Sequence, residues 1–363
     1  MKLPPSRFRR LSIVSKLSLL MTILLLIAIL LIVNNVFTRK PETQPHSAHA
    51  SPAPTHTADI SPTPSYAVGT SPLIFGANLD RQISTSPHAQ ALVKQLGLRT
   101  IRLGDTTNGT SLAEFYNQAQ TIKDMGLVPL IILHAGGIAD PEQRRTIDIA
   151  MVSKIQQIFG GPNVEVYYEL GNENDLNPGM DASAYTAMWN TLLPTLKPLA
   201  PHSWFGGPVN FQQNPAYIAY FVHNAQPKPN FISWHEYTCG RDALASDCIK
   251  HIDNWTIHVN NTHNAITANR DAVPPIMITE WNYSPTGITG DGKSSDPLFL
   301  EQWTTKALQT LAANNVFASY HFNVEEVLGL VDNDNNPTVQ GQAFHAACEH
   351  LLGNGANSTP KCS

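Results

Sequence analysis

The sequence predicts an α/β fold: a (β/α)8 (TIM) barrel that follows a single transmembrane helix and a Pro/Ser/Thr-rich linker. Three observations support this prediction. Residues 17–38 contain no charged side chain, and residues 39–71 are rich in Pro, Ser and Thr. From residue 72 to residue 363, short apolar runs alternate with longer amphipathic stretches. Eight such alternations span about 280 residues, close to the ~250 residues of a typical barrel.

Length and composition are consistent with one large globular domain. The chain has 363 residues, of which 42% are hydrophobic, and its formal net charge is −5. It has no basic excess of the kind that a nucleic-acid surface requires, so we expect no nucleic-acid partner. Charged residues make up only 14% of the chain, which favours a protein that works outside the cell on neutral polar ligands.

The amino end has the pattern of a membrane anchor. Lys2, Arg7, Arg9, Arg10 and Lys16 precede the uncharged run, which exceeds the ~20 apolar residues needed to cross a bilayer. Positive charge on this side predicts that residues 1–16 are cytoplasmic and that the rest of the chain lies outside. A cleaved signal peptide is the alternative, although its apolar region is usually only ~7–15 residues long. We expect an uncleaved, single-pass signal anchor.

Residues 39–71 connect this anchor to the predicted barrel. Their sequence, which includes SPAPTHTADISPTPS, has too few apolar side chains to form a core. Its prolines favour an extended spacer. We therefore expect a disordered linker that holds the domain away from the membrane.

Four cysteines agree with an oxidising location. Cys239 and Cys248 lie within one loop region, and Cys348 and Cys362 lie near the carboxyl end. These local pairs are the preferred two disulfides among the three possible connectivities. Unpaired buried thiols are the alternative, and neither spacing resembles a zinc site.

The barrel is predicted from eight apolar runs and the amphipathic segments between them. The predicted strands are 73–78, 100–105, 128–137, 164–170, 203–210, 231–238, 275–283 and 317–323. The predicted helices are 86–96, 111–125, 141–159, 182–196, 217–224, 253–269, 298–314 and 339–352. An open doubly wound sheet is the alternative, but it more often carries a glycine-rich turn after its first strand, and the segment LIFGANLD lacks one.

Polar side chains gather at one end of these predicted strands. They are Asn78, Arg102, Asp105, His134, Glu173, Asn210, His235, Tyr237, Glu280, His321 and Asn323. Because the carboxyl ends of barrel strands meet at one face, we expect these groups to surround one site. Asn78 and His134 are accordingly predicted to contact the substrate.

Two glutamates in this set suit glycosidic bond cleavage. Glu173 follows the fourth predicted strand, and Glu280 lies on the seventh. Cleavage with retention needs a protonated acid and an ionised carboxylate ~5–5.5 Å apart. We expect Glu173 to be the acid/base and Glu280 the nucleophile. Asn172 would then donate to the sugar 2-hydroxyl group.

Neighbouring residues are predicted to support this pair. Arg102 and Tyr237 are expected to keep Glu280 ionised, and His235 shares a strand face with Tyr237 because side chains alternate. Trp281 and Trp234 offer flat faces for stacking on a sugar. The alternatives are a rim ion pair for Arg102, a buried structural histidine for His235, and ordinary packing for the tryptophans. Glu169 is interpreted as a hydrogen-bonded residue inside the barrel.

Motifs for other mechanisms are missing from the sequence. Cys239 stands where a zinc protease needs its second histidine after His235. There is no Gly-x-Ser-x-Gly elbow, no phosphate loop, and no glycine or distal glutamate of a calcium loop after Asp332. We therefore expect neither a metal nor a cofactor.

With these residues in place, the chain resembles the retaining glycoside hydrolases of clan A. The motifs are ELGNEND with Glu173, WHEY on the sixth strand, and ITEWNYS with Glu280. The likeness is greatest to the family 39 β-xylosidase type, with arabinofuranosidase-like and heparanase-like members as neighbours, and it covers roughly residues 72–353. It implies the acid/base and nucleophile roles given above. Many relatives have Pro where this chain has Asn174.

The sequence thus predicts a membrane-anchored, extracytoplasmic retaining glycosidase that acts on β-linked glycosides. The rival interpretation is a barrel that binds carbohydrate without cleaving it and tethers the cell to a polysaccharide. Both glutamates and Arg102 are present, which favours the enzyme. The sugar and the choice between internal and terminal cleavage depend on the loops after the strands.

Overall fold

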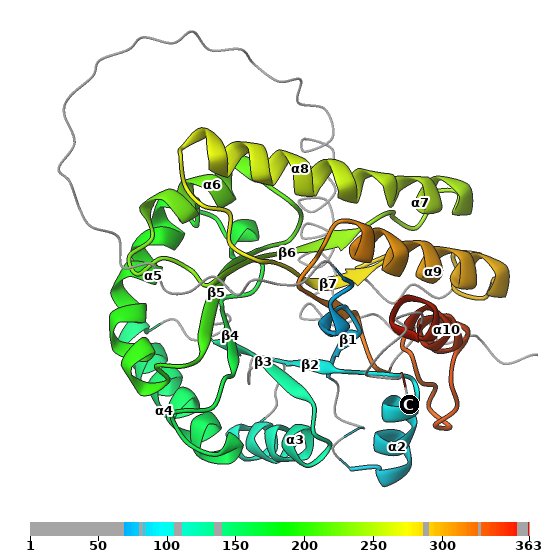
Figure 1. Ribbon diagram of the computed structural model, residues 1–363, viewed down its shortest axis with the longest axis horizontal. Coiled ribbons are helices and arrows are strands. Elements are labelled where there is room, and N and C mark those ends of the chain that lie inside the picture. The colour runs from blue at the N-terminus through cyan, green and yellow to red at the C-terminus, as the bar shows by residue number, and fades with distance from the viewer. Residues whose placement is uncertain are drawn as a thin grey trace, which may run out of the picture. The chain divides into compact units, whose positions relative to one another are not determined.

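The computed structural model describes residues 69–79, 83, 85–104, 111–133, 140–285, 290–325, 328–353 and 362. Within these residues, parallel strands β1 to β8 close into a barrel in sequence order (Figure 1). The strands are β1 (Gly76–Asn78), β2 (Thr100–Leu103), β3 (Val128–Leu133), β4 (Tyr167–Leu170), β5 (Trp204–Asn210), β6 (Phe231–Tyr237), β7 (Ile276–Asn282) and β8 (Ala318–His321). The predicted (β/α)8 barrel is confirmed.

Helices surround the barrel. They are α2 (Pro87–Gln95), α3 (Leu112–Asp124), α4 (Pro141–Phe159), α5 (Ala182–Leu196), α6 (Pro215–Asn224), α7 (Ala245–His251), α8 (Asp253–Ala268), α9 (Pro297–Ala313) and α10 (Val339–Gly353). Every predicted helix is present, with ends shifted by at most two residues. Helix α7 was not predicted, because Cys248 is its only buried residue and its sequence therefore shows no apolar stripe.

Most of the helices that follow the strands begin at capping residues. In six of them a side-chain oxygen of the residue before the helix accepts a backbone N–H of the first turn. These capping residues are Ser86, Ser111, Asp140, Asp181, Asn214 and Asp296. The caps end the connections that leave the carboxyl ends of the strands, and so they help to define the rim around those ends.

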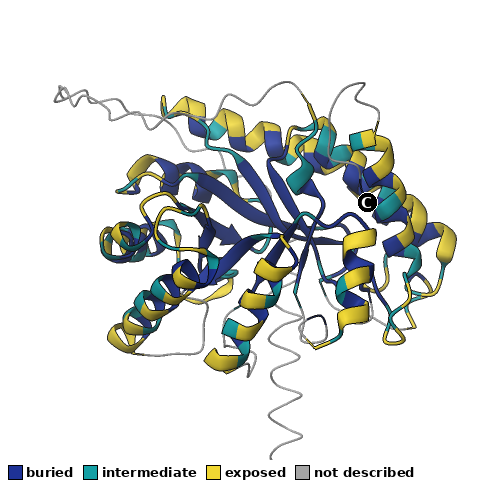
Figure 2. Ribbon diagram, turned by 60° about the horizontal axis from the view of Figure 1, so that its bottom comes forward, coloured by how far each residue is buried: buried dark blue, intermediate teal, exposed yellow. Residues whose placement is uncertain are grey.

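The barrel interior changes from apolar to polar along the strands. A cluster of Leu130, Tyr167, Phe231, Met277, Phe317, Ala318 and Tyr320 fills one end. The larger apolar cluster lies between the strands and the helices, and Figure 2 shows buried strands inside helices with exposed outer faces. Toward the carboxyl ends, buried charged groups take over, among them Arg102, Glu169 and Glu280. The apolar end closes the barrel, so the polar end is where a ligand can approach.

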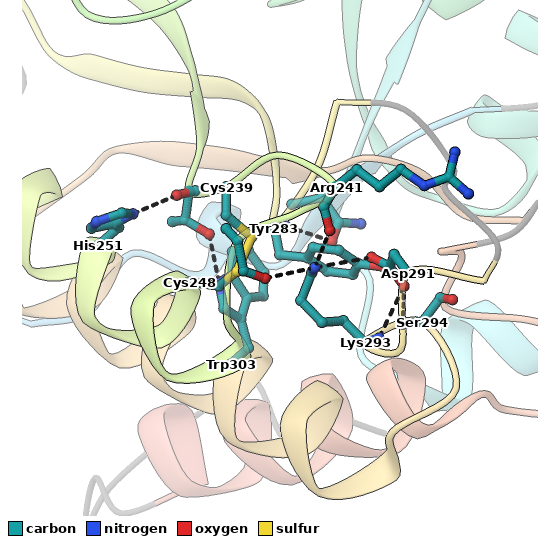
Figure 3. Close-up of a disulfide and its surroundings, with 12 residues drawn as sticks. Cys239, Arg241, Cys248, His251, Tyr283, Asp291, Lys293, Ser294 and Trp303 are labelled. Atoms are coloured by element: carbon teal, nitrogen blue, oxygen red, sulfur yellow. Dashed lines mark hydrogen bonds and ion pairs between the residues drawn. A yellow bond between two sulfur atoms is a disulfide. The ribbon is translucent and has the colours of Figure 1, made fainter. Parts of the chain in front are cut away.

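The connections after β6 and β7 are joined at the rim (Figure 3). Cys239 is bonded to Cys248, which links the β6 connection to α7. The buried ammonium of Lys293 donates to the carbonyls of Arg241 and Ala243 at 2.7 and 2.9 Å, which ties the β7 connection to the same segment. The second disulfide joins Cys348 to Cys362. Both preferred pairings are confirmed.

The predicted cytoplasmic segment (1–16), the predicted anchor (17–38) and residues 39–68 of the predicted linker lie outside the described residues. Among the helices that the structure does describe, none combines the length and apolarity needed to cross a bilayer.

Candidate active site

A strained turn after β4 presents Glu173. Gly171 has φ +91° and Glu173 has φ +50°, a left-handed conformation that is uncommon outside glycine. The N–H of Glu173 donates to the carbonyl of Val209 at 2.9 Å, and Val209 itself has φ +59°. A β-branched residue in this region is a genuine outlier, and such strain clusters at functional sites. The turn therefore holds Glu173 in one orientation at an energetic cost.

Glu280 projects from β7 into the barrel and is 7% exposed. Its Oε1 accepts from Nη1 of Arg102 at 2.6 Å, and its Oε2 accepts from the hydroxyl of Tyr237 at 2.5 Å. Each carboxylate oxygen therefore has a donor from another strand. Such pairing is what keeps a buried carboxylate ionised.

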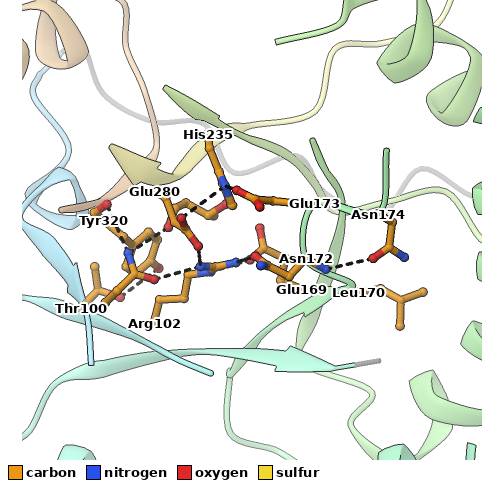
Figure 4. Close-up of polar contacts among 12 residues, drawn as sticks. Thr100, Arg102, Glu169, Leu170, Asn172, Glu173, Asn174, His235, Glu280 and Tyr320 are labelled. Atoms are coloured by element: carbon orange, nitrogen blue, oxygen red, sulfur yellow. Dashed lines mark hydrogen bonds and ion pairs between the residues drawn. The ribbon is translucent and has the colours of Figure 1, made fainter. Parts of the chain in front are cut away.

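Glu173, Glu280 and His235 converge (Figure 4). One ligand atom from each lies within 4.8 Å of the others. Nδ1 of His235 is 2.9 Å from Oε1 of Glu173 and 3.4 Å from Oε2 of Glu280. The two glutamates, 107 positions apart in sequence, thus face one another across the space beside this imidazole, as the strand-end pattern predicted.

The guanidinium of Arg102 lies beneath the carboxylates and contacts several of the site residues (Figure 4). Besides Glu280, its guanidinium donates to Oε2 of Glu169 at 2.7 Å and to Oδ1 of Asn172 at 2.7 Å. It also donates to Oδ1 of Asn78 at 2.9 Å. Arg102 is 1% exposed, so it supports the site from inside the barrel. The interpretation of Glu169 as a hydrogen-bonded barrel residue agrees with this contact.

The contact with Arg102 also orients Asn172. A guanidinium can only donate, so it fixes the side-chain oxygen of Asn172 toward Arg102. The amide nitrogen, a double donor, is then directed away from Arg102. Asn172 is half-buried and directly precedes Glu173, which suits a donor to a substrate hydroxyl beside that carboxylate.

The electrostatics of the site favour an ionised Glu280. Burial alone would raise the pKa of Glu280, but the charges of His235 and Arg102 and the Tyr237 hydrogen bond lower it below its usual range. Burial and the Glu280 carboxylate raise the pKa of Tyr237 well above its ordinary value, so its hydroxyl remains a donor. Glu280 is thus set up as a carboxylate at neutral pH.

We expect Tyr237→Phe to raise the pKa of Glu280, because it removes one of the donors that favour the carboxylate. The acidic limb of the pH profile of kcat/KM should move to higher pH. At the plateau, kcat/KM should fall about 10- to 100-fold, the worth of a hydrogen bond to a charged group. Tyr220→Phe makes the same chemical change on the exposed face of α6 and serves as the control. An unmoved acidic limb would contradict this assignment.

Comparison with solved structures finds this fold among glycoside hydrolases. A family 39 β-xylosidase from Caulobacter crescentus shares 16% identity, with 77% of this chain and 72% of that chain covered, at a TM-score of 0.56. A family 51 α-L-arabinofuranosidase from Bifidobacterium longum shares 12% identity, with 77% and 73% covered, at 0.58. A glucosidase from Croceicoccus marinus shares 12%, with 78% and 69% covered, at 0.58.

No model of a protein family and no curated protein matches the sequence. The likeness to solved structures, at these identities, is one of fold. The structures that share the fold include the β-xylosidase and arabinofuranosidase types that the sequence motifs resemble.

The predicted substrate contact of Asn78 is corrected, because the Asn78 side chain already has protein partners. Nδ2 of Asn78 lies within hydrogen-bond distance of three backbone carbonyls, those of Thr279, Tyr320 and His321, while its oxygen accepts from Arg102. Asn78 therefore supports Arg102, and through it Glu280, rather than the substrate. The contact of Arg102 with Glu280 agrees with the predicted role of Arg102.

The prediction that Trp281 stacks on a sugar is wrong. Trp281 is fully buried, donates to Oγ of Ser319 at 3.2 Å and stacks on Trp303 of α9. Trp234 is likewise fully buried and donates to Glu236. Side chains alternate along a strand, so the inward position of Glu280 sends Trp281 outward to the helix layer. His134 lies outside the described residues.

The structure brings two unpredicted aromatic residues to the site. Phe211, directly after β5, and Phe322, directly after β8, are both half-buried. Their rings contact that of Tyr237, with centroids 6.0 and 6.3 Å away. Their positions directly after strands are the sequence signal that could have indicated a site residue. A phenylalanine at a strand end is, however, equally typical of core packing.

Glu173, His235 and Glu280 form the one group in the described part of the chain with the spacing of a metal site. Their surroundings fit proton transfer better. Both oxygens of Glu280 already accept from Arg102 or Tyr237, and the guanidinium charge beside Oε1 disfavours a second cation.

Proposed function

We propose that the protein is a retaining β-glycosidase that cleaves β-linked glycosides or polysaccharide fragments by double displacement. The observation that carries the proposal is the facing pair of Glu173 and Glu280, with oxygens within 4.8 Å. Retaining enzymes place their carboxyl groups ~5–5.5 Å apart, whereas inverting enzymes need ~6.5–9.5 Å to admit a water molecule. The spacing supports retention.

In this proposal, Glu280 attacks the anomeric carbon while Glu173 donates a proton to the leaving-group oxygen. This forms a glycosyl–enzyme ester and releases the leaving group. Glu173 then takes a proton from water, which attacks the same carbon and returns Glu280 as a carboxylate. The amide nitrogen of Asn172 donates to the 2-hydroxyl, a bond that strengthens as positive charge develops on the ring.

A panel of aryl glycosides tests the proposal. We expect the wild-type chain to hydrolyse at least one of the β-xyloside, β-glucoside, β-galactoside, β-glucuronide and α-arabinofuranoside. Proton NMR of the first-formed sugar should show the anomeric configuration of the substrate. Inversion would contradict the mechanism, and glycan binding without turnover would favour a binding protein instead.

Action outside the cytoplasm, on a single-pass anchor, is part of the proposal. The two disulfides support an oxidising compartment. The anchor rests on the sequence of residues 17–38. We expect membranes that contain the full chain to retain it after washing at alkaline pH, and protease added outside intact cells to digest it. Release by the wash would contradict the anchor.

A further inference from the structure

The rings of Phe211 and Phe322 both contact the ring of Tyr237. The Phe211 ring lies at 31° to the Tyr237 ring, and the Phe322 ring at 87°. Both phenylalanines are half-buried, unlike the enclosed tryptophans of β6 and β7. They therefore combine a flat apolar surface with access to a ligand, the combination that favours stacking on a ring.

The backbone ties each phenylalanine to a different glutamate. The N–H of Phe211 donates to Oδ1 of Asp175 at 3.0 Å, two residues after Glu173 in the same turn. Val209, two residues before Phe211, supplies the carbonyl that accepts from the Glu173 N–H. Phe211 and Glu173 are thus joined at two points between β4 and β5.

Phe322 is joined instead to the strand of Glu280. Its N–H donates to the carbonyl of Trp281 at 3.0 Å, and its carbonyl accepts from Nδ2 of Asn282 at 2.6 Å. Both partners follow Glu280 on β7. The backbone of Phe211 is therefore tied to the Glu173 turn, and that of Phe322 to the Glu280 strand.

The surroundings of the two glutamates contact different parts of the substrate, given the proposed function on which this inference rests. The acid/base carboxyl reaches the oxygen of the leaving group, while the nucleophile bonds the anomeric carbon of the sugar that stays. Side chains fixed to the Glu173 turn thus border the leaving group. Side chains fixed to the Glu280 strand border the retained sugar.

We infer that Phe211 determines leaving-group specificity by stacking on a flat apolar face, either a pyranose ring or an aryl group. Leu176, which is 57% exposed, lies three residues after Glu173, and its N–H donates to the Glu173 carbonyl. It adds an exposed apolar side chain to the turn that carries Glu173. The site thus selects glycosides whose leaving group is a ring rather than a small alkyl group.

Two substrates with the same sugar and different leaving groups test this inference. One is the 4-nitrophenyl glycoside that the wild type hydrolyses fastest, and the other is the matching glycosyl fluoride, whose leaving atom cannot stack. We expect Phe211→Ala to lower the ratio of kcat/KM for the aryl glycoside to that for the fluoride about tenfold, the upper range for an aromatic contact. A ratio unchanged from wild type would overturn the inference.

Three further variants distinguish the effect of the flat Phe211 ring from a loss of activity toward both substrates. Phe211→Tyr keeps the ring and should keep the ratio within about twofold, whereas Phe211→Leu keeps an apolar side chain without a flat face and should lower the ratio as Ala does. Phe322→Ala should lower kcat/KM for both substrates in parallel. If Phe211→Ala also lowered both in parallel, the leaving-group role would be wrong. A wild type that hydrolyses no 4-nitrophenyl glycoside of the panel would instead refute the proposed function and this inference with it.

Discussion

Replacement of Glu280 by Ala is expected to lower kcat for an aryl glycoside by at least about 10⁴-fold, as loss of a covalent nucleophile does in other enzymes. The fold should survive, because Arg102 keeps its contact with Glu169 at 2.7 Å and is not left as an unpaired buried charge. Steady-state kinetics with circular dichroism as the check on folding would measure both effects. Glu142→Gln, at a side chain that is 81% exposed, is the matched control.

Added azide tests whether the activity lost in the Glu280→Ala variant is that of a nucleophile. In the Glu280→Ala variant, azide can occupy the vacated space and attack the anomeric carbon from the side that Glu280 used. The aryloxide leaves, and the product is a glycosyl azide of inverted configuration. A Glu280→Ala variant that keeps wild-type turnover, or an azide product of retained configuration, would contradict the assignment.

Replacement of Glu173 by Gln is expected to reduce activity in proportion to how much the leaving group needs a proton. For a methyl glycoside, kcat/KM should fall about 10²- to 10⁴-fold, the usual worth of general acid catalysis. For a 2,4-dinitrophenyl glycoside, whose leaving group departs as a stable anion, the first step should be nearly unaffected. Equal losses on both substrates would show that Glu173 is not the acid.

The left-handed backbone at Glu173 adds a stability test at the same position. Glu173→Asn and Glu173→Gln both remove the carboxylic acid, but Asn tolerates φ +50° far better than Gln does. We expect the Asn variant to be more stable by about 1 kcal/mol, since left-handed non-glycine residues cost on the order of 1–3 kcal/mol. Chemical denaturation would measure this difference, and equal stabilities would show that the turn stores no strain.

The misassigned tryptophans show where sequence reasoning stopped short. Side chains alternate along β7, so the inward direction of Glu280 already places Trp281 outward. The flat face of a tryptophan suits a sugar, but strand geometry decides which way the side chain points. The phenylalanines that do border the site could not be selected in this way, because irregular backbone decides where they point. The register of β5 against β6 shifts between Pro208 and Asn210, immediately before Phe211.

Asn78 and Arg102 show a second feature that the sequence does not predict, namely the partner of a polar side chain. Both lie at strand ends facing the site, as predicted, but strand position does not tell whether a polar side chain faces the ligand or another side chain. Four partners, carried by β1, β4, the turn after β4 and β7, meet the Arg102 guanidinium. This set exists only once the barrel is closed, and it changes Asn78 from a predicted ligand contact into a support for Arg102 and Glu280.

The sequence alone determined the barrel, the disulfide pairs and the strand ends that carry Glu173 and Glu280, because these depend on local apolar periodicity and on short separations along the chain. Closure of the barrel decided the rest: the spacing of the two carboxylates, the donors that keep Glu280 ionised and the aromatic rings beside them. These features depend on contacts between residues far apart in sequence, whose register and side-chain direction are fixed only by packing.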